Sequence, residues 1–216
     1  MHLAPPFSDG NLVGVSVSRE TWERLVDYSQ TVATWSRSIS MLSSADPARL
    51  WNRHILDSAQ LWPLRHRDTR LWADLGTGAG LPGVVLAIIA HQLSPDMRFH
   101  LVESDQRKAA FLRFVESRQR LGLKIHATRI EALEPLIAQT VTARALAPLP
   151  KLLGLVGRHL ADGGTALLPK GENVAEELAE AKKTWCFTIK QHPSKLDSRA
   201  SILQISGIGK SGKPRA

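Results

Sequence analysis

The feature of the sequence that most constrains its fold is a cluster of glycines after a short apolar run. Residues 71–75 read Leu-Trp-Ala-Asp-Leu, Gly76, Gly78 and Gly80 follow, and an apolar helical pattern begins near Gly83. This order predicts a strand, a tight loop and a helix. Glycines adopt positive φ without strain, and the first turn of a helix offers unpaired N–H groups. We therefore expect the loop to bind a nucleotide-like ligand.

Two nucleotide classes compete for this loop. Gly78 to Gly83 satisfies the G-x-G-x-x-G pattern of dinucleotide-binding enzymes. In that fold the first glycine ends the strand, which here is Gly76, and counting from it puts Leu81 where the last glycine should be. The spacing fits better as Asp-x-Gly-x-Gly-x-Gly from Asp74, a pattern typical of S-adenosylmethionine-dependent methyltransferases. A plain strand-to-helix turn is the remaining interpretation.

A second acid supports the methyltransferase interpretation. Glu103 ends the next predicted strand, over residues 98–103. In this class of enzyme such an acid accepts hydrogen bonds from both ribose hydroxyls of the donor. Because the strands of a doubly wound sheet end at one crevice, we expect Gly76 and Glu103 to lie close together.

Further segments give the chain a specific resemblance. It resembles the RsmG (GidB) family of 16S ribosomal RNA guanine-N7 methyltransferases over nearly all of its length after residue 18. The resemblance is carried by residues 53–58 (Arg-His-Ile-Leu-Asp-Ser), 74–83 (Asp-Leu-Gly-Thr-Gly-Ala-Gly-Leu-Pro-Gly), 129–131 (Arg-Ile-Glu), 144–145 (Arg-Ala) and 168–171 (Leu-Pro-Lys-Gly). One departure is that Ser40-Met41-Leu42 replaces the Asn-Leu-Thr that is common after the first helix of the family.

The resemblance implies a site for S-adenosyl-L-methionine without a metal. Backbone at Gly76 and Leu81 would hold the amino-acid end of this cofactor, and Ile130 with Glu131 would border its adenine. The residues expected to bind the cofactor are Asp74, Gly76, Gly78, Gly80, Leu81, Glu103, Ile130, Glu131 and Arg144. Those expected nearest the reaction are His54, Arg144 and Lys170.

Each residue of the reaction group also has a structural interpretation. His54 and Ser58 lie one helical turn apart with Asp57 beside them, so this cluster either borders the donor or ties the helix to the main domain. Arg144, at the end of the fourth predicted strand, either contacts the donor's carboxylate or the substrate, or forms a structural ion pair. Lys170 either contacts a phosphate or base or is an ordinary loop lysine.

Hydrophobic periodicity predicts an α/β protein with a doubly wound, Rossmann-like methyltransferase fold and an N-terminal helical extension. A loose arm (1–17) precedes a helix from Ser18 to about Ser36, and a second helix begins at the cap Asp46 with Pro47 and ends at Pro63. Seven strands alternating with helices follow, at 71–75, 98–103, 123–128, 140–144, 163–168, 185–191 and 201–206. We divide the chain into an arm with helical extension (1–66), a methyltransferase domain (67–209) and a basic tail (210–216).

Charge favours a nucleic-acid partner. The chain has 28 Lys and Arg against 20 Asp and Glu, and the excess lies after residue 66. A basic excess suits a polyphosphate, and residues 105–120 predict a helix with a basic face. The expected partner is 16S ribosomal RNA or the small ribosomal subunit. No apolar run approaches the roughly 20 residues that span a bilayer, so we expect a cytoplasmic protein. The resemblance implies that it acts as a monomer.

Three other functions remain open: methylation of another RNA or a small molecule, NAD-dependent oxidoreduction, and non-catalytic RNA binding. The only tyrosine, Tyr28, lies in the first predicted helix, so the Tyr-x-x-x-Lys pair familiar in such oxidoreductases is missing. Guanine N7 is the acceptor that needs the fewest catalytic groups, because no proton has to be removed from it before it attacks the methyl group. Methylation of an exocyclic amine usually uses an Asp/Asn-Pro-Pro-aromatic motif, and this chain has no such motif at residues 143–148. Methylation of carbon 5 of a pyrimidine needs a cysteine nucleophile, and the one cysteine, Cys186, is predicted to pack in a strand away from the crevice.

Overall fold

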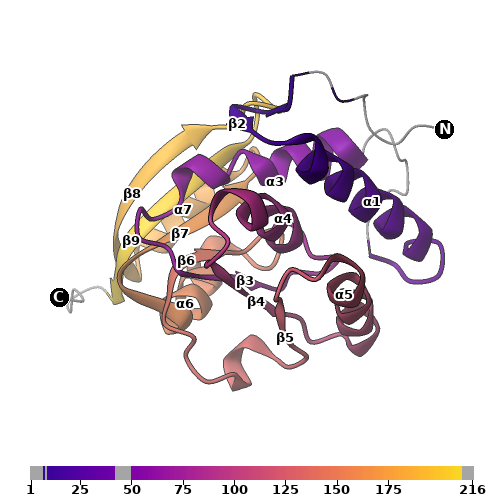
Figure 1. The fold of residues 1–216 in the computed structure, drawn as a ribbon. Helices are drawn as coiled ribbons and strands as arrows, with labels where there is room; N and C mark the ends of the chain where they lie inside the picture. Colours follow the sequence, from indigo (N-terminus) through magenta and orange to yellow (C-terminus); the bar gives the residue numbers. More distant parts are fainter. Residues whose placement is uncertain (1–6, 8, 42–49, 211–216) are drawn as a thin grey trace.

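A seven-stranded mixed sheet carries the fold (Figure 1). The computed structural model describes residues 7, 9–41 and 50–210. The strands lie in the order β5-β4-β3-β6-β7-β9-β8, with β9 antiparallel to both of its neighbours and the first five parallel. They are β3 (Leu71–Leu75), β4 (Arg98–Val102), β5 (Lys124–His126), β6 (Ala138–Thr142), β7 (Leu160–Lys170), β8 (Trp185–Pro193) and β9 (Ser201–Lys210). The chain reverses its direction of travel across the sheet between β3 and β6, which places a ligand crevice at the carboxyl ends of these strands.

Helices cover both faces of the sheet, as the doubly wound prediction requires. Successive strand residues point to opposite faces, so Trp72 packs into one core and Ala73 into the other. The first core also contains α1 (Arg19–Trp35), α4 (Gly83–Leu93) and α5 (Gln106–Gln119), and the second contains α6 (Leu149–His159) and α7 (Val174–Lys182). A mixed sheet with helices on both faces confirms the predicted doubly wound α/β fold class.

The described part of the N-terminal arm is ordered, which corrects the prediction of a loose arm. Strands β1 (Asn11–Leu12) and β2 (Val15–Ser16) form a small hairpin. Its apolar side chains Leu12, Val15 and Val17 are at most 5% exposed and join the core with α1. The prediction failed because two-residue strands are too short to show a period. The helix α1 itself was predicted correctly, with the Ser18 side chain accepting from the Thr21 amide.

The second segment of the helical extension differs in shape from the predicted helix. The predicted cap at Asp46 and Pro47 lies outside the described residues. From Trp51 the chain forms η1 (Trp51–Leu56), a π-helical turn, then α3 (Asp57–Ala59) and η2 (Trp62–Leu64), a 3-10 turn. Pro63 therefore lies inside a 3-10 turn rather than at the end of one long helix. A widened π turn is common at functional sites because it redirects the side chains that it carries.

The last two strands form a hairpin, although a helix was expected between every pair of strands. In Figure 1 β8 and β9 curve together at the edge of the sheet, and they pair directly from Trp185–Lys210 to Pro193–Ser201. Lys210 thus belongs to β9 and not to a tail, while the rest of the predicted basic tail lies outside the described residues. Cys186 is exposed on β8, so the expectation that it packs in the core is wrong.

We predict that Gly83→Ala destabilises the protein. A Cβ at this first residue of α4 would lie 2.4 Å from the Leu101 Cδ2 atom and 2.8 Å from the Asp74 Oδ2 atom. The helix would have to move off the sheet, at a cost of about 1–2 kcal/mol in the free energy of unfolding measured with urea. Gly171→Ala is the matched control, because nothing lies within 4 Å of its added Cβ. Equal stabilities for the two variants would contradict the tight approach of α4.

Candidate functional site

The loop after β3 has the backbone that its glycines predicted. Gly76, Gly78 and Gly80 have φ values of 65°, 59° and 90°. A Cβ at Gly76 would lie 2.6 Å from a methyl group of Leu146, and one at Gly80 would lie 2.4 Å from a methyl group of Val84. At Gly78 nothing lies within 4 Å of the added atom. Two of the glycines are therefore packed against protein, while Gly78 faces open space where a ligand can approach the backbone.

Asp74 lies behind the loop and not at its surface. It is fully buried, and its Oδ2 atom accepts from the Thr77 hydroxyl at 2.5 Å and from the Gly83 amide at 2.9 Å. Its Oδ1 atom accepts from the Thr142 hydroxyl at 2.8 Å. Burial raises the pKa of Asp74 to about 6, against the opposing effect of these hydrogen bonds. The carboxyl group thus holds the loop, the start of α4 and the end of β6 together.

Glu103 lies next to Gly78, as the crevice argument predicted. The Glu103 Oε2 atom accepts from the Gly78 amide at 2.9 Å, and its Oε1 atom accepts from the Asp105 amide at 2.8 Å. The residue is only 8% exposed. Each carboxylate oxygen has a second lone pair, so the group can accept from two hydroxyls of a ligand while it keeps its backbone partners.

A cavity of about 710 Å³ opens in front of the loop. Its volume is in the range of small-molecule sites. The loop contributes Thr77, Gly78, Ala79 and Leu81 to the wall, and the helical extension contributes Met41, Asn52, Arg53, His54 and Asp57. Met41 is the middle residue of the segment that departs from the family pattern. Arg144 and Ala145 complete the wall beyond β6, together with Leu196, Asp197 and Ala200 from the β8–β9 connection.

His54 comes from the π turn and is held neutral. Burial lowers its pKa to about 4, and the positive charges of Arg144 and Arg53 act in the same direction. Its Nδ1 atom is buried and has no hydrogen-bond partner among the described residues. At neutral pH the imidazole is therefore an uncharged group in the cavity wall that can donate or accept one hydrogen bond.

An ion pair between Arg144 and Asp57 lies where this cavity adjoins a second one. The Arg144 Nη1 atom lies 3.3 Å from the Asp57 Oδ2 atom, and the two side chains are only 19% and 24% exposed. The second cavity has a volume of about 550 Å³ and shares Asp57, Arg144, Ala145 and Ala200 with the first. Its other lining residues include Gln60, Leu146, Pro148, Lys170, Ser194 and Ile202.

Lys170 lies in the wall of the second cavity and is held by groups on two neighbouring segments. Its ammonium donates to the Glu177 Oε2 atom at 2.7 Å and to the Ala147 carbonyl at 3.1 Å. The same Glu177 oxygen accepts from the Leu149 amide at the start of α6, at 2.6 Å. This pair, with Lys170 only 10% exposed, fixes the segment between β6 and α6.

Ile130 and Glu131 follow β5, which pairs with β4, the strand that ends just before Glu103. They form the 3-10 turn η3 (Ile130–Ala132) just after β5, with Ile130 buried and Glu131 exposed. The turn is tied to Glu103 through β5, since the Glu103 amide donates to the His126 carbonyl at 3.0 Å. It is also tied to the buried His159, whose Nε2 atom lies 3.0 Å from the Ile130 carbonyl.

Five of the eleven expected residues line the two cavities, whereas Asp74, Gly76, Gly80, Glu103, Ile130 and Glu131 are in the lining of neither. His54, Gly78, Leu81 and Arg144 line the first cavity, and Lys170 lines the second. The sequence analysis missed Glu177 and the β8–β9 connection. Neither has a motif: Glu177 meets Lys170 because α7 folds back beside β7, and the β8–β9 connection is placed by the pairing of β9 with β7.

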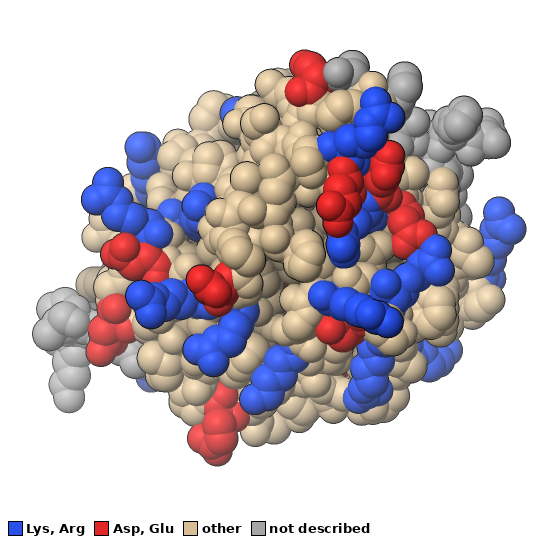
Figure 2. All heavy atoms as spheres, in the orientation of Figure 1, with Lys and Arg blue, Asp and Glu red and all other residues tan. Residues whose placement is uncertain are grey.

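The surface charge is more mixed than the basic face predicted for residues 105–120. On the face drawn in Figure 2, Asp and Glu side chains lie among the Lys and Arg side chains. On α5, Arg118 pairs with Asp27 and Arg107 with Asp105. Arg113 and Arg120 are exposed. Part of the expected basic face is thus neutralised within the protein.

Within the described ranges, no cluster of three or more His, Cys, Asp or Glu residues is arranged to hold a metal ion. A search of the same residues finds no helix that is long and apolar enough to span a bilayer.

The fold and the glycine loop with its two acids define a class, the Rossmann-like methyltransferases. Solved structures with this fold include the ribosomal protein L11 methylase of Lactobacillus delbrueckii subsp. bulgaricus, with a TM-score of 0.55 and 19% identity over 71% of this chain and 78% of that one. Another is the O-methyltransferase TomG of Streptomyces achromogenes in complex with S-adenosyl-L-methionine, with a TM-score of 0.55 and 13% identity over 83% of this chain and 89% of that one. At such identities the likeness shows the fold.

The sequence comparisons are more specific. The chain belongs to the GidB family, rRNA small subunit methyltransferase G, whose sequence model matches residues 21–202. Proteins named ribosomal RNA small subunit methyltransferase G are 46% identical in Cereibacter sphaeroides, over 90% of this chain and 93% of that protein, and 42% identical in Ruegeria pomeroyi, over 90% and 95%. The resemblance found in the sequence is thereby confirmed, and the protein is an enzyme that methylates small-subunit rRNA. Its methyl donor is S-adenosyl-L-methionine.

The neutral state of His54 predicts how stability depends on pH. The folded protein binds its proton only near pH 4, whereas the unfolded chain binds it near 6.5, so the contribution of the neutral imidazole is complete above pH 6.5 and is lost as the pH falls towards 4. Relative to His54→Gln, the wild-type free energy of unfolding should fall by about 1–2 kcal/mol between pH 7 and pH 4, allowing for partial exposure. Urea denaturation across this range measures it. The other histidines are common to both proteins and their effects cancel. Parallel curves would therefore show that folding does not lower the pKa of His54.

Proposed function

We propose that this enzyme transfers the methyl group of S-adenosyl-L-methionine to guanine N7 in 16S ribosomal RNA. The observation that carries the proposal is the pair of cavities that meet at Arg144 and Asp57. One cavity borders the glycine loop, and the other borders the ends of β6 and β7. Because the two cavities share Asp57, Arg144, Ala145 and Ala200, a donor in one and an acceptor base in the other would meet beside these residues.

The first cavity suits the donor. The Gly78 backbone and the Glu103 carboxylate lie side by side at 2.9 Å, which fits a ribose whose hydroxyls donate to the acid. Ile130 and Glu131 would then border the adenine. Gly76 and Leu81 lie on the side of the amino-acid end, where the Arg144 guanidinium can attract a carboxylate. Asp74 and Gly80 support the loop from behind.

The second cavity suits a purine. Leu146, Pro148 and Ile202 offer apolar contacts for a flat ring, and Gln60 and Ser194 offer polar ones. During transfer the bond from carbon to sulfur breaks and a bond from carbon to N7 forms, so the positive charge passes from the sulfonium to the purine. The Asp57 carboxylate in the shared wall is placed to favour that change. Holding the two partners in line can contribute about 7–11 kcal/mol.

The surroundings of Lys170 and His54 favour N7 over acceptors that must lose a proton. The Lys170 ammonium is engaged by Glu177 and the Ala147 carbonyl, and the low pKa of His54 makes it a weak base. A ring nitrogen with a free lone pair needs no base, whereas a ribose hydroxyl does. We further propose that the enzyme acts as a cytoplasmic monomer on the ribosomal RNA or the assembled subunit.

Glu103→Ala is predicted to weaken donor binding. Removing an ionised acceptor of two hydroxyls should raise the Kd of S-adenosyl-L-methionine about tenfold or more, because charged hydrogen bonds contribute about 1.5–3 kcal/mol each. Calorimetry measures the change, and S-adenosylhomocysteine and NAD serve as comparison ligands. The control is Glu134→Ala, which removes an exposed acid beyond η3. An unchanged Kd in the Glu103 variant would remove this residue from the donor site.

The acceptor atom has a chemical test. RNA methylated at guanine N7 breaks at the modified base after treatment with borohydride and aniline. We predict that 16S ribosomal RNA incubated with the enzyme and labelled donor breaks at a single guanine, and that naked RNA and small subunits can be compared in the same assay. Incorporation of label without cleavage would refute N7, and labelling of other RNA alone would refute the substrate.

A further inference from the structure

Tyr28 links the N-terminal extension to the donor loop. The phenol of this α1 residue donates a hydrogen bond to the Ala79 carbonyl at 2.6 Å. Tyr28 is 1% exposed and Ala79 is 3% exposed, so water does not compete for this bond. Ala79 also contributes to the wall of the first cavity, next to Gly78. The hydroxyl of α1 therefore holds the back of a backbone segment whose front faces the donor.

The surroundings of the phenol favour this role. A Cβ at Gly80 would lie 3.1 Å from the Tyr28 oxygen, so the side chain also packs against the loop. Burial raises the pKa of Tyr28 far above its ordinary value, which keeps the phenol protonated. Within the loop, the Gly80 and Leu81 amides donate to the Thr77 carbonyl at 2.9 Å and 3.0 Å. Tyr28 adds a contact from α1 to a turn that Asp74 and these internal hydrogen bonds hold from the side of the sheet.

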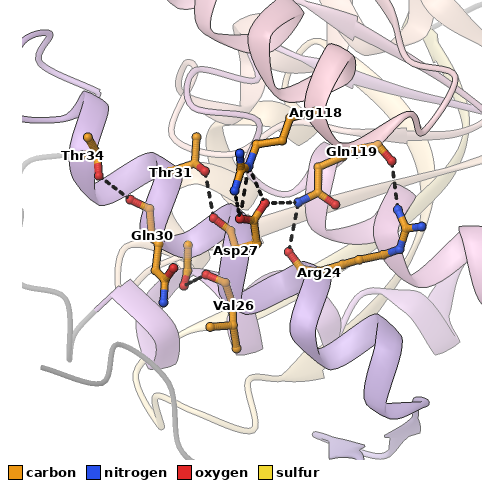
Figure 3. A network of polar contacts seen from close by, with 9 residues as sticks. Arg24, Val26, Asp27, Gln30, Thr31, Thr34, Arg118 and Gln119 are labelled. Atoms are coloured by element: carbon orange, nitrogen blue, oxygen red, sulfur yellow. Dashed lines mark hydrogen bonds and ion pairs between the residues drawn. The ribbon is translucent and has the colours of Figure 1, made fainter.

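A polar network holds α1 against the end of α5 (Figure 3), and the neighbouring Tyr28 side chain is buried. The Asp27 carboxylate accepts from the Arg118 guanidinium, with Nε at 2.8 Å from Oδ2, and from the Gln119 side chain at 2.7 Å. Arg24 donates to the Gln119 carbonyl at 2.9 Å. These partners end α5, the helix that begins after Glu103. The extension is thus attached both to the glycine loop and to α5, the helix that follows Glu103.

We propose that Tyr28 is a positioning residue that holds the glycine loop in its donor-binding geometry, which makes the N-terminal extension part of the donor site. The inference depends on the proposed placement of the donor at this loop. A loop that is competent for only a fraction of the time binds its ligand with a Kd raised by the inverse of that fraction. Loss of the hydroxyl leaves the buried Ala79 carbonyl unpaired and favours other loop conformations.

The test is Tyr28→Phe, which removes one oxygen and keeps the ring. We expect the Kd for S-adenosylhomocysteine and the KM for the donor to rise about fivefold to tenfold, while kcat at saturating donor stays within about twofold, because bound donor restores the loop. The matched control is Thr34→Val on the same helix. Its hydroxyl donates only within α1, to the Gln30 carbonyl at 2.9 Å, and donor binding should not change.

Because Tyr28 is the only tyrosine, labelling with ¹³Cζ-tyrosine gives one NMR resonance for this contact. We expect S-adenosylhomocysteine to shift that resonance in the wild-type protein, which a tyrosine that only packs α1 would not show. An unchanged Kd in Tyr28→Phe would overturn the inference. Glu103→Ala separates the two proposals: if it weakens binding and Tyr28→Phe does not, only the role of Tyr28 fails, and if neither does, the donor placement fails.

Discussion

The buried carboxyl group of Asp74 is the interaction on which the site depends. It accepts from Thr77 in the loop, from the first amide of α4 and from Thr142 on β6, so one side chain joins three elements that meet at the crevice. The cost of burying it is offset by these three donors, and leaving any of them unpaired would cost about 1–3 kcal/mol. Gly83 must lack a side chain for the helix to come this close. Loop shape, helix position and sheet register are therefore set together.

The sequence predicted the parts of the fold whose signals are local. The glycines, the strand-ending acids and the helical periods gave seven strands, helices on both faces and a shared crevice, and six of the nine expected cofactor residues lie within or directly against the loop after β3. What it did not predict are features that exist only through tertiary packing. No residue pattern marks the β1–β2 hairpin, the π turn that carries His54 or the direct β8–β9 hairpin, and Lys170 meets Glu177, seven residues later, only because α7 folds back beside β7.

The helical extension contributes to the walls of the candidate site. It supplies His54 and Asp57 to the front of the cavities, and Tyr28 to the back of the loop. The sheet supplies the glycine loop, Glu103 and Arg144. The segment that precedes the sheet thus supplies part of the cavity wall of this enzyme. The Arg144–Asp57 ion pair joins that segment to the end of β6.

The strand order has a consequence for the order in which the protein is made. Strand β8 joins the sheet only through β9, since β9 lies between β7 and β8. Synthesis runs from the N-terminus, so β8 leaves the ribosome before the strand that it must pair with, and the connection that carries Leu196 and Ala200 to the cavity wall stays without its scaffold until then. The wall of the first cavity is therefore complete only after β9 has been made and has paired with β7.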